Sequence, residues 1–211
     1  MRYKSISVNK RISDFILSLK ESWRLVLLVS VFICGLIIGA FAVKNNDSLL
    51  SSQLEEIIKT SIIKKNDLTF LKSFMDSLVS DLLFLIITFS LGLCAIGIPA
   101  ISVIPLIKGF SVGITGAYIY LNYSVKGVCY CLLVLFPAQI ISAAILIFAC
   151  NESFYMSADL FSTINNKALI KDKNLVRLYL TRFGLLSVLM ILTSLFDALL
   201  SKLFSSIFSF I

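Results

Sequence analysis

Long apolar blocks separated by short charged segments constrain this chain more than any other feature of its sequence. Hydrophobic residues make up 58% of the 211 residues and charged residues 15%, whereas a soluble domain is nearer half apolar and a quarter charged. The blocks approach the length of about twenty residues that a helix needs to cross a bilayer. The sequence therefore predicts a multi-pass membrane protein, and it excludes a disordered chain, a collagen-like repeat and a small disulfide scaffold.

Five apolar blocks predict an all-α bundle of about five transmembrane helices with interfacial amphipathic helices around it. Residues 1–24 form a basic tail with one apolar helical face, which either lies on the inner leaflet or simply extends the first span. Residues 25–211 form a single membrane domain. It contains an outer segment at 44–81, an inner segment at 151–182, and spans at about 25–43, 82–98, 100–123, 127–150 and 183–203.

The 19 basic residues outnumber the 12 acidic residues. Because these charges flank apolar blocks, the excess indicates membrane topology and contact with anionic lipid rather than nucleic-acid binding. With the N-terminus inside, twelve basic residues lie in inner segments and seven in outer ones. The expected orientation in the membrane is therefore N-terminus inside and C-terminus outside.

Catalytic chemistry is missing from the sequence. There is no histidine, so the commonest metal ligand and neutral-pH proton carrier is absent. The five cysteines, expected to be buried inert thiols, form no CxxC pair, and neither a P-loop nor a nucleophile elbow occurs. We expect a non-enzymatic protein with no catalytic, cofactor-binding or metal-ligating residues.

Glycine and proline mark the expected helix contacts and turns. Glycine pairs at GxxxG spacing let helices approach closely, and prolines remove backbone donors and disfavour helix before them. The stretch around Pro99 and Pro105 predicts either a tight turn at the inner face or a broken, re-entrant helix. The helix-packing or turn residues are Gly35, Gly39, Gly97, Pro99, Pro105, Gly109, Gly113 and Pro137.

Three polar residues fall inside the expected spans. Lys108 is the only charge between Asp81 and Lys126; it is expected to snorkel at the inner interface, and the alternative is a lysine that lines a polar cavity. Gln139 needs a partner within the bundle, close to a packing kink at Pro137. Asp197, near the outer end of the last span, is expected to be interfacial or to contact another helix.

The centre of the chain contains four short motifs: Gly97-Ile-Pro99, Lys108-Gly109-Phe110 with Gly113, Lys126-Gly127, and Leu135-Phe-Pro137-Ala-Gln139. These motifs resemble those of the stage II sporulation protein M family, and the resemblance covers about residues 20–205. The family often has a Pro-Gln pair in its fourth span, where Ala138 separates Pro137 from Gln139 here.

The resemblance implies a membrane scaffold of endospore-forming bacteria. Such a scaffold anchors and organises two peptidoglycan-degrading partners, a lytic transglycosylase and an amidase, during engulfment of the forespore. Amphipathic stretches make Ile57, Ile58 and Phe74 of the outer segment the candidate partner contacts. The alternative is a small transport or channel component, in which a homo-oligomer supplies the pore and the interrupted helices build a site near the midplane.

Overall fold

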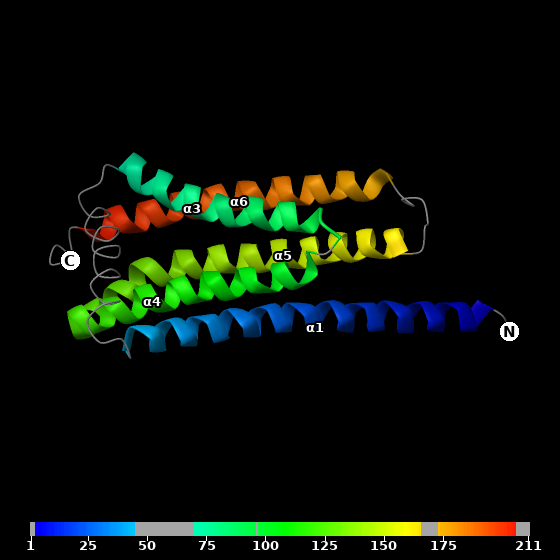
Figure 1. Ribbon diagram of the computed structural model, residues 1–211, viewed down its shortest axis with the longest axis horizontal. Helices are drawn as coiled ribbons and strands as arrows, with labels where there is room; N and C mark the ends of the chain where they lie inside the picture. The colour runs from blue at the N-terminus through cyan, green and yellow to red at the C-terminus, as the bar shows by residue number, and fades with distance from the viewer. Residues whose placement is uncertain (1–2, 45–69, 96, 166–172, 206–211) are drawn as a thin grey trace.

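The computed structural model describes residues 3–44, 70–95, 97–165 and 173–205, with side chains for 23–43, 71, 73–95, 97–121, 128–163 and 175–203. Within these ranges every regular element is a helix and no strand occurs. The elements are α1 (Tyr3–Lys44), α3 (Phe70–Gly92), α4 (Ile98–Tyr130), the π-helix η1 (Cys131–Leu135), α5 (Phe136–Asn165) and α6 (Lys173–Ser205) (Figure 1).

The described residues contain five stretches that are long and apolar enough to cross a membrane. Large apolar side chains such as Leu185 and Ile140 are exposed on the outside of the bundle, as expected for a surface that faces lipid. The prediction of an all-α, multi-pass membrane bundle is therefore confirmed. The stretches are Trp23–Val43, Ser73–Gly92, Ile98–Leu121, Val128–Thr163 and Leu175–Leu203.

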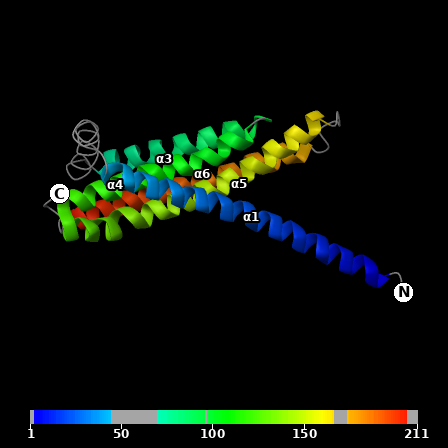
Figure 2. The same ribbon diagram turned by 60° about the horizontal axis from the view of Figure 1, so that its bottom comes forward.

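The helices alternate in direction along the bundle, so that the chain enters at one end and leaves at the other (Figure 1). Figure 1 shows α5 running antiparallel to α4, and the Phe136 ring lies 3.5 Å from the Cβ position of Gly116, so the chain reverses between these two residues. α1 packs against α4, whereas α3 packs against α5 and α6, and Figure 2 shows α1 running obliquely across the other helices. The bundle thus consists of an α1–α4 layer and an α3–α6 layer, with α5 between them.

A short turn, not a broken helix, joins α3 to α4. The Cys94 amide donates to the Leu91 carbonyl and the Gly97 amide to the Cys94 carbonyl, both at 3.1 Å. Pro99 is the second residue of α4, where a missing N–H costs nothing. Pro105 lies inside α4 without ending it. The tight-turn alternative is right, and the broken, re-entrant helix is wrong.

Pro137 has a different effect, because it follows a π-helical turn. Residues Cys131–Leu135 form η1, closed by the Phe136 amide, which donates to the Cys131 carbonyl. A proline ring clashes with the carbonyl four residues before it and brings no donor of its own. The wider π-turn accommodates both effects. The kink expected at Pro137 is therefore a π-bulge, in which the turn before the proline contains one residue more than an α-helical turn.

Three predicted boundaries need correction. α3 begins at Phe70, inside the expected outer segment 44–81. α5 continues to Asn165 and α6 begins at Lys173, so most of the expected inner segment 151–182 is helical. Instead of separate interfacial helices, the amphipathic stretches here are continuous with the spans. The expectations for the surface of the 1–24 tail, and for residues 45–69, fall outside the described side chains.

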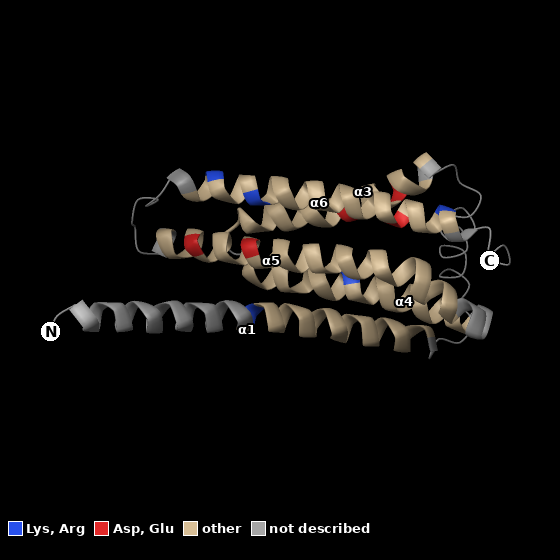
Figure 3. Cartoon of the chain, turned by 180° about the vertical axis from the view of Figure 1, so that it is seen from behind, with Lys and Arg blue, Asp and Glu red and all other residues tan. Residues whose placement is uncertain are grey.

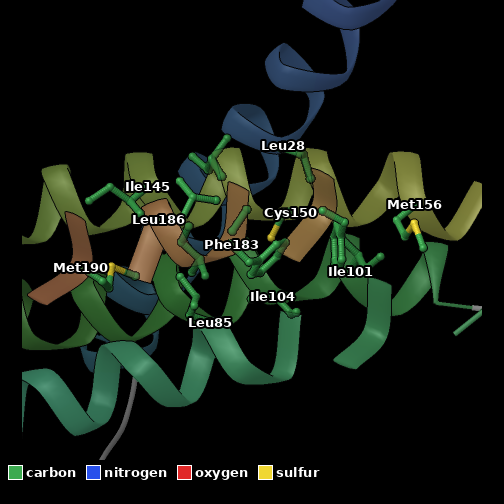
Figure 4. Packing of buried hydrophobic residues seen from close by; sticks show 14 residues of the cluster. Leu28, Leu85, Ile101, Ile104, Ile145, Cys150, Met156, Phe183, Leu186 and Met190 are labelled. Atoms are coloured by element: carbon green, nitrogen blue, oxygen red, sulfur yellow. The ribbon is translucent and has the colours of Figure 1, made fainter. Parts of the chain in front are cut away.

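The main apolar core contains side chains from all five long helices. Leu28 of α1, Leu85 of α3, Ile104 of α4, Leu146 of α5 and Met190 of α6 belong to one buried cluster. Figure 4 shows its side chains pointing towards one another between the ribbons. In a bilayer these side chains would otherwise contact lipid rather than water. Close packing, and not the hydrophobic effect, therefore stabilises the cluster.

Glycines form the contact between α1 and α4, which is called the glycine seam below. The pairs at 35/39 and 109/113 face each other, and a Cβ atom at any of the four positions would collide with backbone of the other helix. The colliding carbonyls belong to Leu106 for Gly35, Phe110 for Gly39, Phe32 for Gly109 and Leu36 for Gly113. Both predicted GxxxG pairs therefore lie in one interface.

Candidate functional site

The interior of the bundle carries an unusual number of polar groups for a membrane protein. Few charges interrupt its middle, and most lie towards the two ends (Figure 3). α3 places Ser73, Ser77, Asp81 and Thr88 at helical spacing along one face, and facing helices supply the partners of Ser77 and Asp81. The buried polar residues are Ser73, Asp81, Thr88, Lys108, Ser142, Asn151, Ser153, Ser157, Thr193, Ser194, Asp197 and Ser201.

Lys108 and Asp81 form an ion pair at the centre of this face. The Lys108 Nζ donates to Asp81 Oδ1 at 2.7 Å, and the two side chains are only 6% and 8% exposed. Lys108 is the eleventh residue of α4, which places it about 15 Å along the helix from its start. The Phe84 ring lies 5.5 Å from Nζ and adds a cation–π contact.

This geometry corrects the expectation for Lys108, because the side chain does not snorkel to the inner interface. It turns into the bundle and contacts α3. Sequence reasoning missed Asp81, which the expected start of the second span left in the outer segment. One signal was available: Asp81 lies eleven residues before the end of α3, and Lys108 ten residues after the start of α4. Residues equidistant from a tight antiparallel turn lie at the same depth.

Asp197 lies in the half of the bundle that contains the start of α3, and it contacts that helix. The Ser77 hydroxyl donates to Asp197 Oδ2 at 2.6 Å, and Asp197 itself is 3% exposed. Tyr130, also buried, lies close enough to Asp197 to interact with it electrostatically. The structure therefore places Asp197 in a contact between helices rather than at the interface.

A third polar group lies near the turn between α3 and α4, around Tyr179. Its hydroxyl is 3.1 Å from the Ser153 hydroxyl and donates to the Phe89 carbonyl at 3.0 Å. Ser153 also donates to the Thr88 carbonyl at 2.9 Å. A Cβ atom at Gly92 would collide with the Tyr179 hydroxyl and with Ser153. These contacts connect α3, α5 and α6 just before the turn at residues 93–97.

Charges at the inner end connect the layers of the bundle. The Arg24 guanidinium of α1 lies 4.4 Å from the Tyr155 ring centroid and 5.1 Å from that of Phe154. Arg182 of α6 contacts both carboxylate oxygens of Glu152 on α5, at 2.6 and 2.7 Å. This second pair is partly exposed, so its contribution to stability is small.

The remaining predicted residues are scattered. Gln139 is half-buried in α5, far along the chain from Lys108 and Asp197. Phe74 is half-buried near the outer end of α3, whereas Ile57 and Ile58 lie outside the described residues. Cys131 and Cys150 are buried as expected, but Cys34, Cys94 and Cys129 are exposed on the surface of the bundle. The structure thus brings Lys108 together with Asp81 and leaves the other candidates apart.

The arrangement pairs Lys108 with Asp81, and several of its hydroxyls, within the protein. In the described ranges no group of three or more histidine, cysteine, aspartate or glutamate side chains is placed to hold a metal ion. What the site does chemically is to fix helices α3, α4 and α6 against one another at a defined depth.

Comparison with known proteins gives one match. The family model described as Stage II sporulation protein M matches residues 28–202, a range that begins in the first membrane span and ends in the last. No curated protein and no solved structure matches the chain.

Proposed function

The chain belongs to the stage II sporulation protein M family of membrane proteins, and on that basis we propose that it is a non-enzymatic scaffold. In this proposal it anchors and organises peptidoglycan-degrading proteins, of lytic transglycosylase and amidase type, during engulfment of the forespore. The observation that supports the proposal most is the extent of the family match, which runs from within the first span to within the last.

The interior of the bundle is consistent with a positioning role. Lys108 and Asp81 neutralise each other, and the glycine seam brings α1 and α4 into backbone contact. A rigid bundle of this kind holds whatever binds to its surface at a fixed distance from the membrane. The surface that would meet cell-wall proteins is the outer end, which includes the start of α3.

The start of α3 offers the contact residues. Leu71 and Met75 are 63% and 49% exposed, and Phe74 is half-buried between them. Large apolar side chains at the edge of a membrane protein are typical of contacts with partner proteins. This surface, together with Ile57 and Ile58, is the proposed docking site.

Co-purification from membranes tests the proposal. Full-length protein carrying glutamate at Ile57, Ile58 and Phe74 should recover at least tenfold less of the two hydrolases than the wild type, because buried charge disrupts an apolar contact. The matched control is Phe161→Glu, an exposed apolar residue at the inner end of α5, which should leave recovery unchanged. Undiminished recovery with the triple variant would count against the outer end as the docking surface.

The proposed orientation places the N-terminus inside and the C-terminus outside. Because Lys108 is buried at mid-depth, it counts for neither side, and eleven basic residues remain in inner segments against seven in outer ones. The excess still favours this orientation. It also places the start of α3 on the cell-wall side, as docking of the hydrolases requires.

The environment of Lys108 distinguishes a transport function from the scaffold function. A lysine that serves a permeating solute must be reachable from water, whereas the Lys108 ammonium is buried and bound to a carboxylate. Solute flux through reconstituted vesicles, abolished by Lys108→Met, would support transport and remove the scaffold as the primary function.

A further inference from the structure

The contact between α3 and α6 near the start of α3 contains one hydrogen-bonded pair, and helical spacing places two further buried hydroxyls beside it. Ser77 and Asp197 are hydrogen-bonded at 2.6 Å, which fixes the register of the two helices. α3 and α6 run antiparallel (Figure 1), so a residue four positions before Ser77 lies opposite one four positions after Asp197. Those residues are Ser73 and Ser201.

Ser73 and Ser201 are buried but unsatisfied. They are 4% and 7% exposed, and neither hydroxyl oxygen has a hydrogen-bond partner. A hydroxyl without a partner in a water-free interior is energetically unfavourable. Two such groups, one helical turn beyond the Ser77–Asp197 pair and facing the same contact, indicate a bound species that the side chains themselves do not supply.

The oxygen set defines the chemistry of that species. Carboxylate and hydroxyl oxygens are ligands for hard cations. One carboxylate supplies a single formal negative charge, which matches a monovalent ion; divalent sites of this kind use more carboxylates, and the described residues hold no group of three acidic or thiol ligands. Membrane transporters also bind sodium with oxygen ligands between packed helices, although their ligands include backbone carbonyls.

We propose that Ser73, Ser77, Asp197 and Ser201 form a binding site for one monovalent alkali cation, with sodium as the probe. The ion is coordinated by Asp197 and the serine hydroxyls and fastens the outer end of α3 to α6. The site lies about 9 Å inside the end of the last span, because Asp197 precedes Leu203 by six residues. The proposal is independent of the scaffold function, since it concerns the bundle and not its partners.

Sodium binding to the purified full-length protein in detergent tests the site. Equilibrium binding of radioactive sodium, in choline chloride at constant ionic strength, should saturate at one ion per chain. The unfolding midpoint should rise with sodium over the same range, because a ligand specific for the folded state stabilises it. Asp197→Asn and Ser77→Ala should weaken binding by about tenfold or more.

Control variants separate the site from general effects of salt. Ser187→Ala, on the exposed face of α6 where the hydroxyl bonds to its own helix, should bind sodium like the wild type. If Asp197→Asn does not fold, Ser73→Ala combined with Ser201→Ala provides the comparison and should lose affinity. Absence of saturable sodium binding to the wild type would overturn the proposal. Wild-type affinity in the double serine variant would overturn it as well, and would indicate that water or a proton occupies the contact.

Discussion

At the scale of single residues, the pair formed by Lys108 and Asp81 is the most costly feature of the interior. Each charge alone would be strongly unfavourable in a bilayer. Together, at 2.7 Å, they offset each other's desolvation without adding much net stability. What the pair contributes is specificity, because other registers of α3 against α4 would leave two separated charges.

Removing one partner should therefore cost more than removing both. Lys108→Met or Asp81→Leu alone should lower the free energy of unfolding by about 3–5 kcal/mol, because each leaves a buried charge without its counter-ion. The double variant should lie within about 1 kcal/mol of the wild type. Unfolding in detergent of the wild type, the two single variants and the double variant measures the four free energies of this double-mutant cycle. A double variant as unstable as the sum of the singles would contradict the pairing.

Tyr179 gives a second test at this scale. Tyr179→Phe keeps the ring stacked on Phe89, with centroids 5.2 Å apart, but removes the hydroxyl that donates to the Phe89 carbonyl. The expected loss is about 1 kcal/mol of unfolding free energy. Tyr120→Phe, at an exposed position of α4, is the matched control and should be neutral.

Sequence reasoning identified the polar residues in the spans but not their partners. Lys108 and Asp197 stood out because each interrupts an apolar stretch. Asp81 and Ser77 did not, because a boundary drawn at residue 82 placed both in a surface segment. A carboxylate lowers the mean hydropathy of the helix that contains it. Mean hydropathy takes no account of a lysine in the next helix that neutralises this carboxylate.

At the scale of elements, glycines and prolines have separate roles. The glycine seam allows α1 and α4 to touch through backbone atoms, with Gly35 and Gly39 against Gly109 and Gly113. The prolines sit where α4 begins, within α4, and after η1. The sequence predicted both glycine pairs as packing positions. Their mutual contact could not be predicted, since GxxxG spacing does not name the opposing helix.

Larger side chains in the glycine seam should separate α1 from α4. Gly109→Val places two methyl groups against the Phe32 carbonyl, and an unfolding free energy lower by roughly 1–3 kcal/mol is expected. Gly184→Ala is the control: nothing lies within 4 Å of its Cβ position, and alanine favours helix, so stability should hold or rise slightly. If Gly109→Val and Gly184→Ala changed the free energy of unfolding equally, the close backbone contact in the glycine seam would be contradicted.

At the scale of the whole molecule, native cysteines offer a topology test. Cys94 lies in the turn between α3 and α4, and Cys129 at the start of the span that follows the opposite reversal; both are exposed. With the N-terminus inside, a membrane-impermeant maleimide added to intact cells should label Cys129 and not Cys94. Cys129→Ser should abolish labelling and Cys94→Ser should leave it unchanged. The reverse pattern would invert the proposed orientation.

The division of the bundle into two layers has a consequence for the order of synthesis. α1 leaves the ribosome first, yet its partner α4 follows only after α3 has been made. Until α4 has been made, α1 therefore has to lie in the bilayer as a single helix. Its span has the highest mean hydropathy of the five spans found in the described residues. The spans of α3 and α4 have the lowest, and each carries one half of a charge pair. We expect α3 and α4 to enter the membrane together as a hairpin, in which the two charges already neutralise each other. α4 then packs against α1.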